Sequence, residues 1–439
     1  MEEEEIKFWS DLDAVVNTPC QGHEEIDNVL RSYLDLSSQF KQGSRSEHDI
    51  ARCSYILLKS KVFRSNQDYV RRQFLYCLLQ EDDVQVLYTV SAMLLSDGRV
   101  NESTFELMQS ESAFPRLIEL VRGGDAHERG FHKLLLELLY ETTRCQKLAP
   151  EEMNTVDDDL ILHLFQLIED VSDDADDPYH YPIIRVLLVL NEQYMCHVAP
   201  NRVIGLLSIH GPKYRTFGEN LIILLNREVA LSPQLLILKI LYLLFTTPAT
   251  FEYFYTNDLH VLVDVVIRNL LDLDPTSGNE RDGQTALTHT YLRVLCPLLK
   301  NSQLARQSTH YKAEEVRRLL HLLVNSSSAH FAPVDETVLR LVKRCRQIEW
   351  LREDDDEKDR VIEQKLAGVK PSSKDVANKA LGMSFGQEGD SSISVTEVAA
   401  KVAKEKPSLP APRRKKKAAN GQLKPPPLQT KCNAASDGR

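Results

Sequence analysis

Signals for β-strands and for a membrane span are nearly absent from this sequence of 439 residues. We find no sustained alternation of apolar and polar residues, which is the pattern of a half-buried strand. No uncharged run approaches the ~18 residues that a membrane-spanning helix needs. The first nine residues, MEEEEIKFW, are too acidic and too short in apolar run for a secretion or import signal.

Paired-cysteine motifs are also missing. No two of the eight cysteines stand in a CxxC spacing. Most of them fall within apolar helical patterns, where a thiol packs as a small hydrophobic group. Together with the lack of a secretion signal, this indicates a reducing compartment, either cytosol or nucleus.

The common catalytic and cofactor motifs are absent too. There is no GxxxxGK followed by Ser or Thr, no GxGxxG after a strand, no HExxH and no GxSxG. The acidic groups at 157–159 and 173–177 lack the alternating order of a calcium loop, so we interpret them, and the nearby His180, as solvated loops. We therefore expect no enzyme, no metal and no cofactor, unless a site is assembled from distant residues.

Apolar residues at helical spacing are abundant. Hydrophobic residues make up 42% of the chain and charged residues 27%, which is typical of a globular protein. Up to about residue 351 the patterns predict one helix after another, joined by short turns. The predicted helices are 3–17, 23–40, 47–63, 67–80, 83–95 (closed by Asp97-Gly98), 102–122 (interrupted at Pro115), 126–148, 160–171, 182–198, 201–209, 217–228, 233–246, 249–255, 258–273, 284–300, 312–324 and 335–351.

The most apolar stretch, residues 231–273, is the expected centre of the fold. Ser232 is the predicted N-cap of its first helix, and Thr247-Pro248 the predicted end, because a residue before proline leaves the helical region. Asn257 or Asp258 should cap the second helix. Apolar residues occupy most of that second helical wheel, so we predict that it is buried on nearly all sides, with layers of helices before and after it.

These patterns predict an all-α fold, an armadillo/HEAT-like α-solenoid over residues 1–352, with an irregular helical domain as the alternative. Residues 353–439 are interpreted as a charged linker and a disordered Pro/Lys-rich tail, since they hold few large apolar residues. Charge supports this division. Residues 1–352 hold 36 Lys and Arg against 51 Asp and Glu, whereas residues 353–439 hold 17 against 13. An acidic body argues against specific nucleic-acid binding.

The tail contains the clearest linear motifs. Pro407 and Pro410 form a PxxP core, with Arg413 close behind it, as in ligands of SH3 domains. A Pro/Lys-rich tail without a binding role is the alternative. The polybasic block at 413–417 also suits nuclear import or a weak contact with anionic lipid. It consists of Arg413, Arg414, Lys415, Lys416 and Lys417.

Two clusters in the helical body are candidates for a partner surface, with an ordinary solvated face as the alternative. The first, in the turn before Phe217, is Lys213, Tyr214 and Arg215. The second, on the last predicted helix, is Arg340, Lys343, Arg344 and Arg346.

Four segments resemble the leucine-rich domain of the WISH/DIP/SPIN family, and in particular its compact fungal members. They are FGENLIILLNRE (217–228), ILKILYLLFTTPATFEYFYTNDLHVLVDVVIRNLLDL (237–273), TYLRVLCPLLKNSQL (290–304) and ETVLRLVKRCRQIEWL (336–351). The resemblance covers about 180–351, is vague before it and is absent from the tail.

The resemblance implies an armadillo-like body that binds and activates the actin-related protein 2/3 complex. Activation would need no preformed filament and would seed linear actin filaments at endocytic actin patches. It also implies SH3-domain partners of the endocytic coat and a cytoplasmic location at cortical actin patches. A solenoid adaptor in trafficking or nuclear transport is the alternative function, because a helical scaffold with a basic tail fits it equally well.

Overall fold

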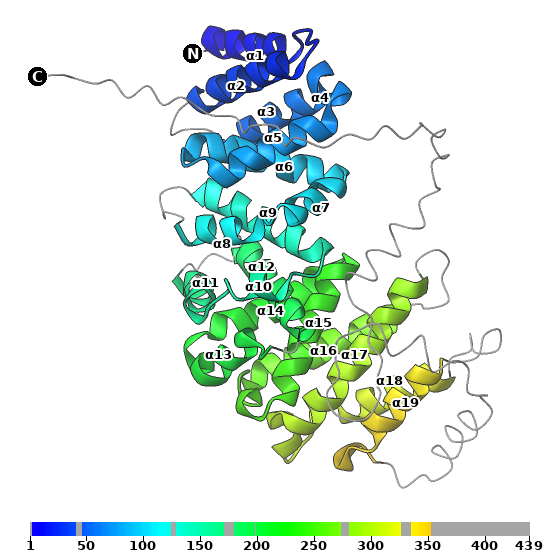
Figure 1. The fold of residues 1–439 in the computed structure, drawn as a ribbon. Helices are drawn as coiled ribbons and strands as arrows, with labels where there is room; N and C mark the ends of the chain where they lie inside the picture. The colour runs from blue at the N-terminus through cyan, green and yellow to red at the C-terminus, as the bar shows by residue number, and fades with distance from the viewer. Residues whose placement is uncertain are drawn as a thin grey trace, which may run out of the picture. The chain divides into compact units, whose positions relative to one another are not determined.

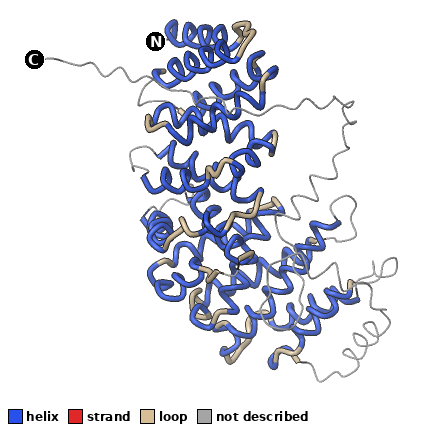
Figure 2. The backbone as a smooth tube through the Cα atoms, in the orientation of Figure 1, coloured by secondary structure: helices blue, strands red, loops and turns tan. Residues whose placement is uncertain are grey.

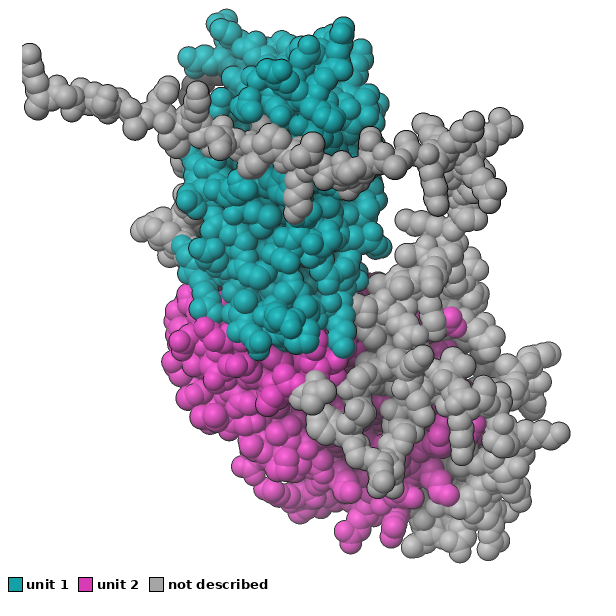
Figure 3. Space-filling model, viewed as in Figure 1, with its two compact units in different colours: residues 1–155, 407–439 teal, residues 156–406 magenta. Residues whose placement is uncertain are grey.

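The computed structural model describes residues 2–40, 46–123, 129–170, 180–197, 199–273, 281–325 and 335–352. These residues form helices and turns with no β-strand among them (Figures 1 and 2). The chain divides into two compact units, with the described residues up to Thr155 in unit 1 and those from Val156 in unit 2 (Figure 3). The predicted all-α solenoid is confirmed. The predicted tail, 353–439, lies outside the described residues.

Unit 1 stacks its helices in succession. Helix α6 is its centre and packs on α2, α3, α5, α7 and α9, while α9 also packs on α7 and α8. The helices of unit 1 are α1 (Glu2–Val16), α2 (His23–Gln39), α3 (Glu47–Lys59), α4 (Lys61–Ser65), α5 (Gln67–Gln80), α6 (Val84–Val100), α7 (Ser103–Ser110), α8 (Phe114–Gly123), α9 (Arg129–Cys145) and α10 (Pro150–Met153).

The prediction that a helix ends before Asp97-Gly98 is wrong, because α6 continues through both residues to Val100. The Asp97 carboxylate is buried and accepts hydrogen bonds from Arg71 Nε at 2.6 Å and from the Thr104 hydroxyl. A Cβ on Gly98 would lie 2.3 Å from the ring of Phe105, so glycine here makes room for α7. Contacts from other helices therefore hold this pair in helical conformation.

Unit 2 arranges its helices in two layers. In one layer α12, α15, α17 and α19 pack on one another in that order, and in the other α11, α14, α16 and α18 do the same. The layers meet through α11–α12, α16–α17 and α18–α19. The helices of unit 2 are α11 (Asp158–Asp170), α12 (His180–Met195), α13 (Arg202–His210), α14 (Arg215–Arg227), α15 (Leu231–Thr246), α16 (Thr256–Asp272), α17 (Arg281–Asn301), α18 (Ala313–Asn325) and α19 (Glu336–Arg346).

The helix that is buried on nearly all sides is α15, not α16 as predicted. Even Lys239 of α15 is only 1% exposed, and its Nζ lies 2.5 Å from Oε1 of Glu192 on α12. In α16, by contrast, Val261 and Leu271 are 53% and 54% exposed. The position of α16 in its layer leaves one of its faces open, which a helical wheel alone does not show.

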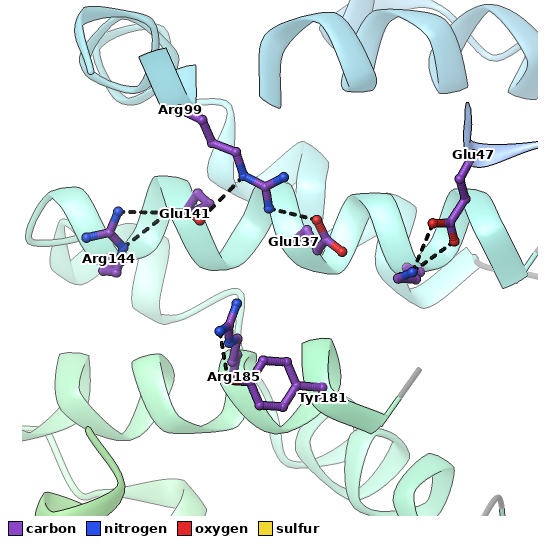
Figure 4. Close-up of polar contacts among 8 residues, drawn as sticks. Glu47, Arg99, Glu137, Glu141, Arg144, Tyr181 and Arg185 are labelled. Atoms are coloured by element: carbon purple, nitrogen blue, oxygen red, sulfur yellow. Dashed lines mark hydrogen bonds and ion pairs between the residues drawn. The ribbon is translucent and has the colours of Figure 1, made fainter. Parts of the chain in front are cut away.

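The start of α15 also differs from the prediction. The helix begins at Leu231, and the Ser232 side chain makes no capping hydrogen bond. Instead, Oε1 of Glu228 accepts hydrogen bonds from the backbone N–H groups of Val229 and Ala230, at 3.1 and 3.0 Å. Glu228 is held in turn by Tyr181 of α12, whose ring carries the Arg185 guanidinium 4.0 Å above its centre (Figure 4).

The end of α15 at Thr246, just before Thr247-Pro248, is as predicted. The short helix predicted at 249–255 is wrong, because only a 3-10 turn, Pro248–Thr250, forms there. The next helix, α16, begins at Thr256 after N-cap Tyr255, whose backbone N–H donates to the Asp258 carboxylate at 3.3 Å. Asp258 thus assists the cap from the third helical position.

Candidate binding surfaces

The turn before α14 carries the first predicted cluster. Lys213 is exposed, and its Nζ lies 5.1 Å from the centre of the Tyr214 ring. Tyr214 is only 4% exposed and stacks on Phe165 of α11, with 5.3 Å between ring centres. Tyr214 therefore supports the turn from beneath, and Lys213 and Arg215 are the members that reach the surface.

Arg215 is held against aromatic rings. Its guanidinium lies 4.8 Å from the centre of the Tyr255 ring and 5.6 Å from that of Tyr253, and it donates to the backbone carbonyl of Glu252 at 3.1 Å. Tyr255 is 56% exposed. A cation on an aromatic face is attracted by the negative charge of the ring face, so these contacts restrict Arg215 to one surface position.

Tyr253 fixes this arrangement from below. It is buried, and its hydroxyl donates to the Tyr214 carbonyl at 2.5 Å. Burial raises the pKa of Tyr253 well above its usual range, so the hydroxyl stays a donor. A Cβ on Gly218 of α14 would lie 2.8 Å from Cε1 of Tyr253, so the ring takes this position only because residue 218 is glycine.

The surroundings of Arg215 include acidic groups. On α14, Glu219 has its pKa raised by burial and by the charges of Asp258 and Glu169. Glu169 of α11 accepts hydrogen bonds from the backbone N–H and the hydroxyl of Thr216, at 2.9 and 2.6 Å. The surface that joins Lys213, Arg215 and Tyr255, called the Arg215 surface below, therefore has both signs of charge around an exposed aromatic ring. This composition suits protein recognition, since Arg and Tyr are enriched among residues that dominate interfaces.

The second predicted cluster lies on α19. Arg340 and Arg344 are exposed, and Lys343 and Arg346 are half-buried. The Arg340 side chain lies 3.8 Å from the carboxylate of Glu336, one turn earlier. Figure 1 shows α19 on the side of unit 2 away from α13. The structure therefore does not bring the two predicted clusters together.

A ladder of ion pairs in unit 1 was not predicted from the sequence (Figure 4). Lys133 of α9 pairs with Glu47 of α3 at 2.9 Å. Glu137 of α9 pairs with Arg99 of α6 at 2.7 Å. Glu141, one turn further, lies 3.6 Å from the same Arg99. The spacing of charged residues along α9 is visible in the sequence, but their partners come from two other helices. Because each of these charges has a partner of opposite sign within the ladder, we assign the ladder to helix packing rather than to a partner protein.

Several predicted residues lie outside the described part of the chain. They are the acidic loop 172–178, the motif Pro407, Pro410 and Arg413, and the polybasic block Arg413 to Lys417. The acidic group at 157–159 is described, and it is not simply a solvated loop. Asp157 accepts a hydrogen bond from the backbone N–H of Leu160 at 2.9 Å, and Asp158 and Asp159 begin α11, where a negative charge favours the helix N-terminus.

The described residues contain neither a candidate metal site nor a candidate membrane span. No group of three or more His, Cys, Asp or Glu side chains in the described ranges could hold a metal ion. Among the described helices, none has the length and apolar character needed to cross a membrane.

Relatives of this chain are found among fungal proteins. Protein dip1 of Schizosaccharomyces pombe is 27% identical over 365 residues, which cover 80% of this chain and 95% of dip1. Protein LDB17 of Saccharomyces cerevisiae is 26% identical over 414 residues, which cover 80% of this chain and 81% of LDB17. Among solved structures, an engineered protein aligns over 81% of this chain and 82% of its own, with 15% identity and a TM-score of 0.39, too loose a likeness to support an argument.

A family model gives the same result from the sequence pattern. The SPIN90/Ldb17 leucine-rich domain matches residues 176–316, which run from just before α12 into α18 and include the Arg215 surface. This range lies within unit 2. It contains in full three of the four segments that resemble the family, namely 217–228, 237–273 and 290–304. Residues 176–316 therefore match the SPIN90/Ldb17 leucine-rich domain, and the chain is similar to dip1 and LDB17 over 80% of its length.

Proposed function

We propose that this protein activates the actin-related protein 2/3 complex by binding it, and that it seeds linear actin filaments without a preformed filament. The match of residues 176–316 to the SPIN90/Ldb17 leucine-rich domain is the observation that carries the proposal, together with the similarity to dip1 over 95% of dip1's length. The protein would act without chemistry of its own. A binding protein activates a complex only if it binds the active arrangement more tightly than the inactive one.

We assign docking to the Arg215 surface rather than to α19 or the α9 ladder. It lies within the leucine-rich domain, and its Arg and Tyr side chains are held in place by Tyr253 and Gly218 beneath them. A surface that is already ordered loses little side-chain freedom on binding. By contrast, α19 lies beyond the matched residues, and the charges of the α9 ladder are already paired with one another.

Actin assembly with purified complex and no added filaments tests the function. We expect the wild-type protein to shorten the lag before filaments appear, in proportion to its concentration. An unchanged lag at saturating protein would reject the proposed function.

The variant Arg215→Ala/Tyr255→Ala tests the docking surface separately. Truncating residues that dominate an interface costs about 2 kcal/mol or more, so the concentration for half-maximal activation should rise about thirtyfold. The matched control is Arg202→Ala, which removes an exposed arginine of unit 2 that pairs with Asp158 at 2.8 Å. If the double variant and the control both behave as wild type, docking lies elsewhere while the function stands.

For the tail we propose SH3-domain ligands at Pro407, Pro410 and Arg413, supported by the PxxP order and the basic residue behind it. The variant Pro407→Ala/Pro410→Ala should lose capture by SH3 domains and keep its effect on actin assembly. Equal capture of variant and wild type would remove the motif from this role.

We further propose a cytoplasmic location at cortical actin patches, which the similarity to the SPIN90/Ldb17 leucine-rich domain and to LDB17 supports. Imaging of tagged protein with an actin marker tests it. Concentration in nuclei that is lost when residues 413–417 become Ala would instead favour the transport adaptor.

A further inference from the structure

Two cysteines of unit 2 meet where α17 packs on α19. Cys296 of α17 is half-buried, and Cys345 of α19 is fully buried directly behind it. Sγ of Cys296 lies 3.9 Å from the carbonyl oxygen of Arg344, and Sγ of Cys345 lies 3.9 Å from that of Leu292, one turn before Cys296. Each sulfur therefore touches the other's helix.

The two thiols also interact directly. A hydrogen bond from the Cys345 thiol, aided by the positive charges of Arg344 and Lys300, lowers the pKa of Cys296 against the effect of its partial burial. The same hydrogen bond and complete burial raise the pKa of Cys345. Cys296 is thus a partly exposed thiol with a lowered pKa, and Cys345 is a buried thiol in contact with it. A reactive thiol next to a second thiol is the arrangement of a redox-sensitive pair.

Other cysteines of the chain differ from Cys296 in this respect. Burial raises the pKa of Cys77 to about 12 and that of Cys145 to about 11, and the pKa of Cys20 is raised as well. Cys145 is the closest comparison, because it is half-buried like Cys296 and also has an arginine beside it, Arg144, whose charge lowers its pKa. Burial and the charges of Glu102, Glu141 and Glu106 outweigh that effect. Exposure alone therefore does not explain why the pKa values of Cys296 and Cys145 differ, whereas the groups around each thiol do.

We propose that Cys296 and Cys345 form a reversible oxidation site, at which peroxide converts the pair into a disulfide that links α17 to α19. In the first step the Cys296 thiolate attacks one oxygen of hydrogen peroxide. The O–O bond breaks, hydroxide leaves, and the sulfur becomes a sulfenic acid while peroxide is reduced. In the second step the Cys345 sulfur attacks the sulfenic sulfur, the S–O bond breaks and the S–S bond forms. The thiol proton leaves with the hydroxyl group as water.

The expected rates follow from the two surroundings. Because the pKa of Cys296 is lowered and that of Cys145 is raised, Cys296 has more thiolate than Cys145 at neutral pH. A thiolate with a lower pKa is a weaker nucleophile, which offsets part of the gain in thiolate. We therefore expect Cys296 to react with peroxide about tenfold faster than Cys145.

The experiment uses the full chain, reduced, freed of reductant and treated with hydrogen peroxide. At each time point the remaining thiols are alkylated, and peptides are mapped by mass spectrometry without reduction. We expect Cys296 and Cys345 to be lost in parallel, a linked peptide to appear, and dithiothreitol to restore both thiols. Oxidation of Cys145 at the same rate, a link to another cysteine, or no linked peptide would overturn the proposal.

Two variants sharpen the assignment. Cys345→Ala removes the second thiol, so the sulfenic acid of Cys296 should persist and be trapped by dimedone. Cys145→Ser should leave the linked peptide unchanged. Because Cys345 is buried, its replacement can weaken folding, but the peptide mapping of the wild-type chain decides the proposal without it. An equal dimedone signal in wild type and Cys345→Ala would also count against the disulfide.

Discussion

Charged side chains of unit 2 occupy two contrasting regions. Between α12 and α15, Lys239 and Glu192 face each other with 1% and 3% exposure. At the start of α14, Arg215 lies on aromatic rings beside an exposed tyrosine. The buried pair cannot contact a partner and acts only through the fold, whereas the surface arginine is available for binding. The location of a charged side chain therefore decides whether it stabilises the fold or is available to bind a partner.

The largest effect should come from Glu192→Leu. It leaves the ammonium group of Lys239 buried without its carboxylate, and breaking a buried ion pair in this way costs about 3–5 kcal/mol of unfolding free energy. The double variant Glu192→Leu/Lys239→Leu removes both charges and should recover most of that loss. Urea unfolding of the full chain, monitored by the circular dichroism signal of its helices, measures the unfolding free energy of both variants.

The matched control for this prediction is Asp158→Ala, which breaks the exposed ion pair with Arg202. Its cost should stay below about 2 kcal/mol, because water replaces the lost partner and losing a negative charge from the first turn of α11 costs at most about 1 kcal/mol. Equal losses for Glu192→Leu and Asp158→Ala would remove the distinction between interior and surface charges.

Helices α6, α15 and α16 show how much of the fold could be predicted from the sequence. The apolar repeats of α15 and α16 are local, so the existence of both helices and the end of α15 near Thr247-Pro248 followed from them. Which of the two helices is covered on all sides depends on neighbours, and α17 packs most extensively on α15. The continuation of α6 through Asp97 depends on Arg71, 26 residues earlier, and no local rule includes that contact.

The candidate surface was predictable only in part. The spacing of Lys213 and Arg215 next to an aromatic residue marked the turn before α14. Tyr255, which completes the surface 40 residues later, gave no signal, because a tyrosine near the start of a helix is unremarkable until Arg215 lies on it. The cysteine pair was missed for the same reason, since Cys296 and Cys345 are joined only by the packing of α17 on α19.

An intermediate effect is expected where interior and surface meet, at Gly218. The Cβ of Gly218→Ala would lie 2.8 Å from Tyr253 and 3.1 Å from Phe254, so the rings that support Arg215 must move. Overpacking of this kind costs about 1–3 kcal/mol, partly offset by the better helix propensity of alanine. We expect a net loss of about 1–2 kcal/mol of unfolding free energy and weaker activation of the complex.

Gly205→Ala on α13 is the matched control, because no atom lies within 4 Å of the position of its Cβ. That variant should gain about 0.5–1 kcal/mol from the lower entropy of the unfolded chain and leave activation unchanged. If Gly218→Ala were also stabilising and fully active, the rings beneath Arg215 would not need their present positions.

The smallest effect should come from an ion pair that is neither buried nor open, between His289 of α17 and Asp335 just before α19. The atoms His289 Nε2 and Asp335 Oδ2 lie 2.5 Å apart. Burial works against the carboxylate charge of Asp335, but the hydrogen bond and charge of His289 outweigh it, so its pKa is lowered.

A carboxyl group whose pKa is lower in the folded state stabilises the protein above its unfolded pKa, about 3.9, and that contribution disappears as the pH falls through the folded value. Asp335→Asn should therefore unfold at a lower urea concentration than wild type at pH 6, and this difference should shrink from about pH 4 downward. Because the Asp335 side chain is 47% exposed, solvent screens the pair and the difference should be smaller than for Glu192→Leu at every pH. A difference between wild type and Asp335→Asn that stays constant down to pH 3 would show that the Asp335 charge does not stabilise α19, and the expected decrease in stabilisation from the buried pair to this partly exposed pair would then lack support.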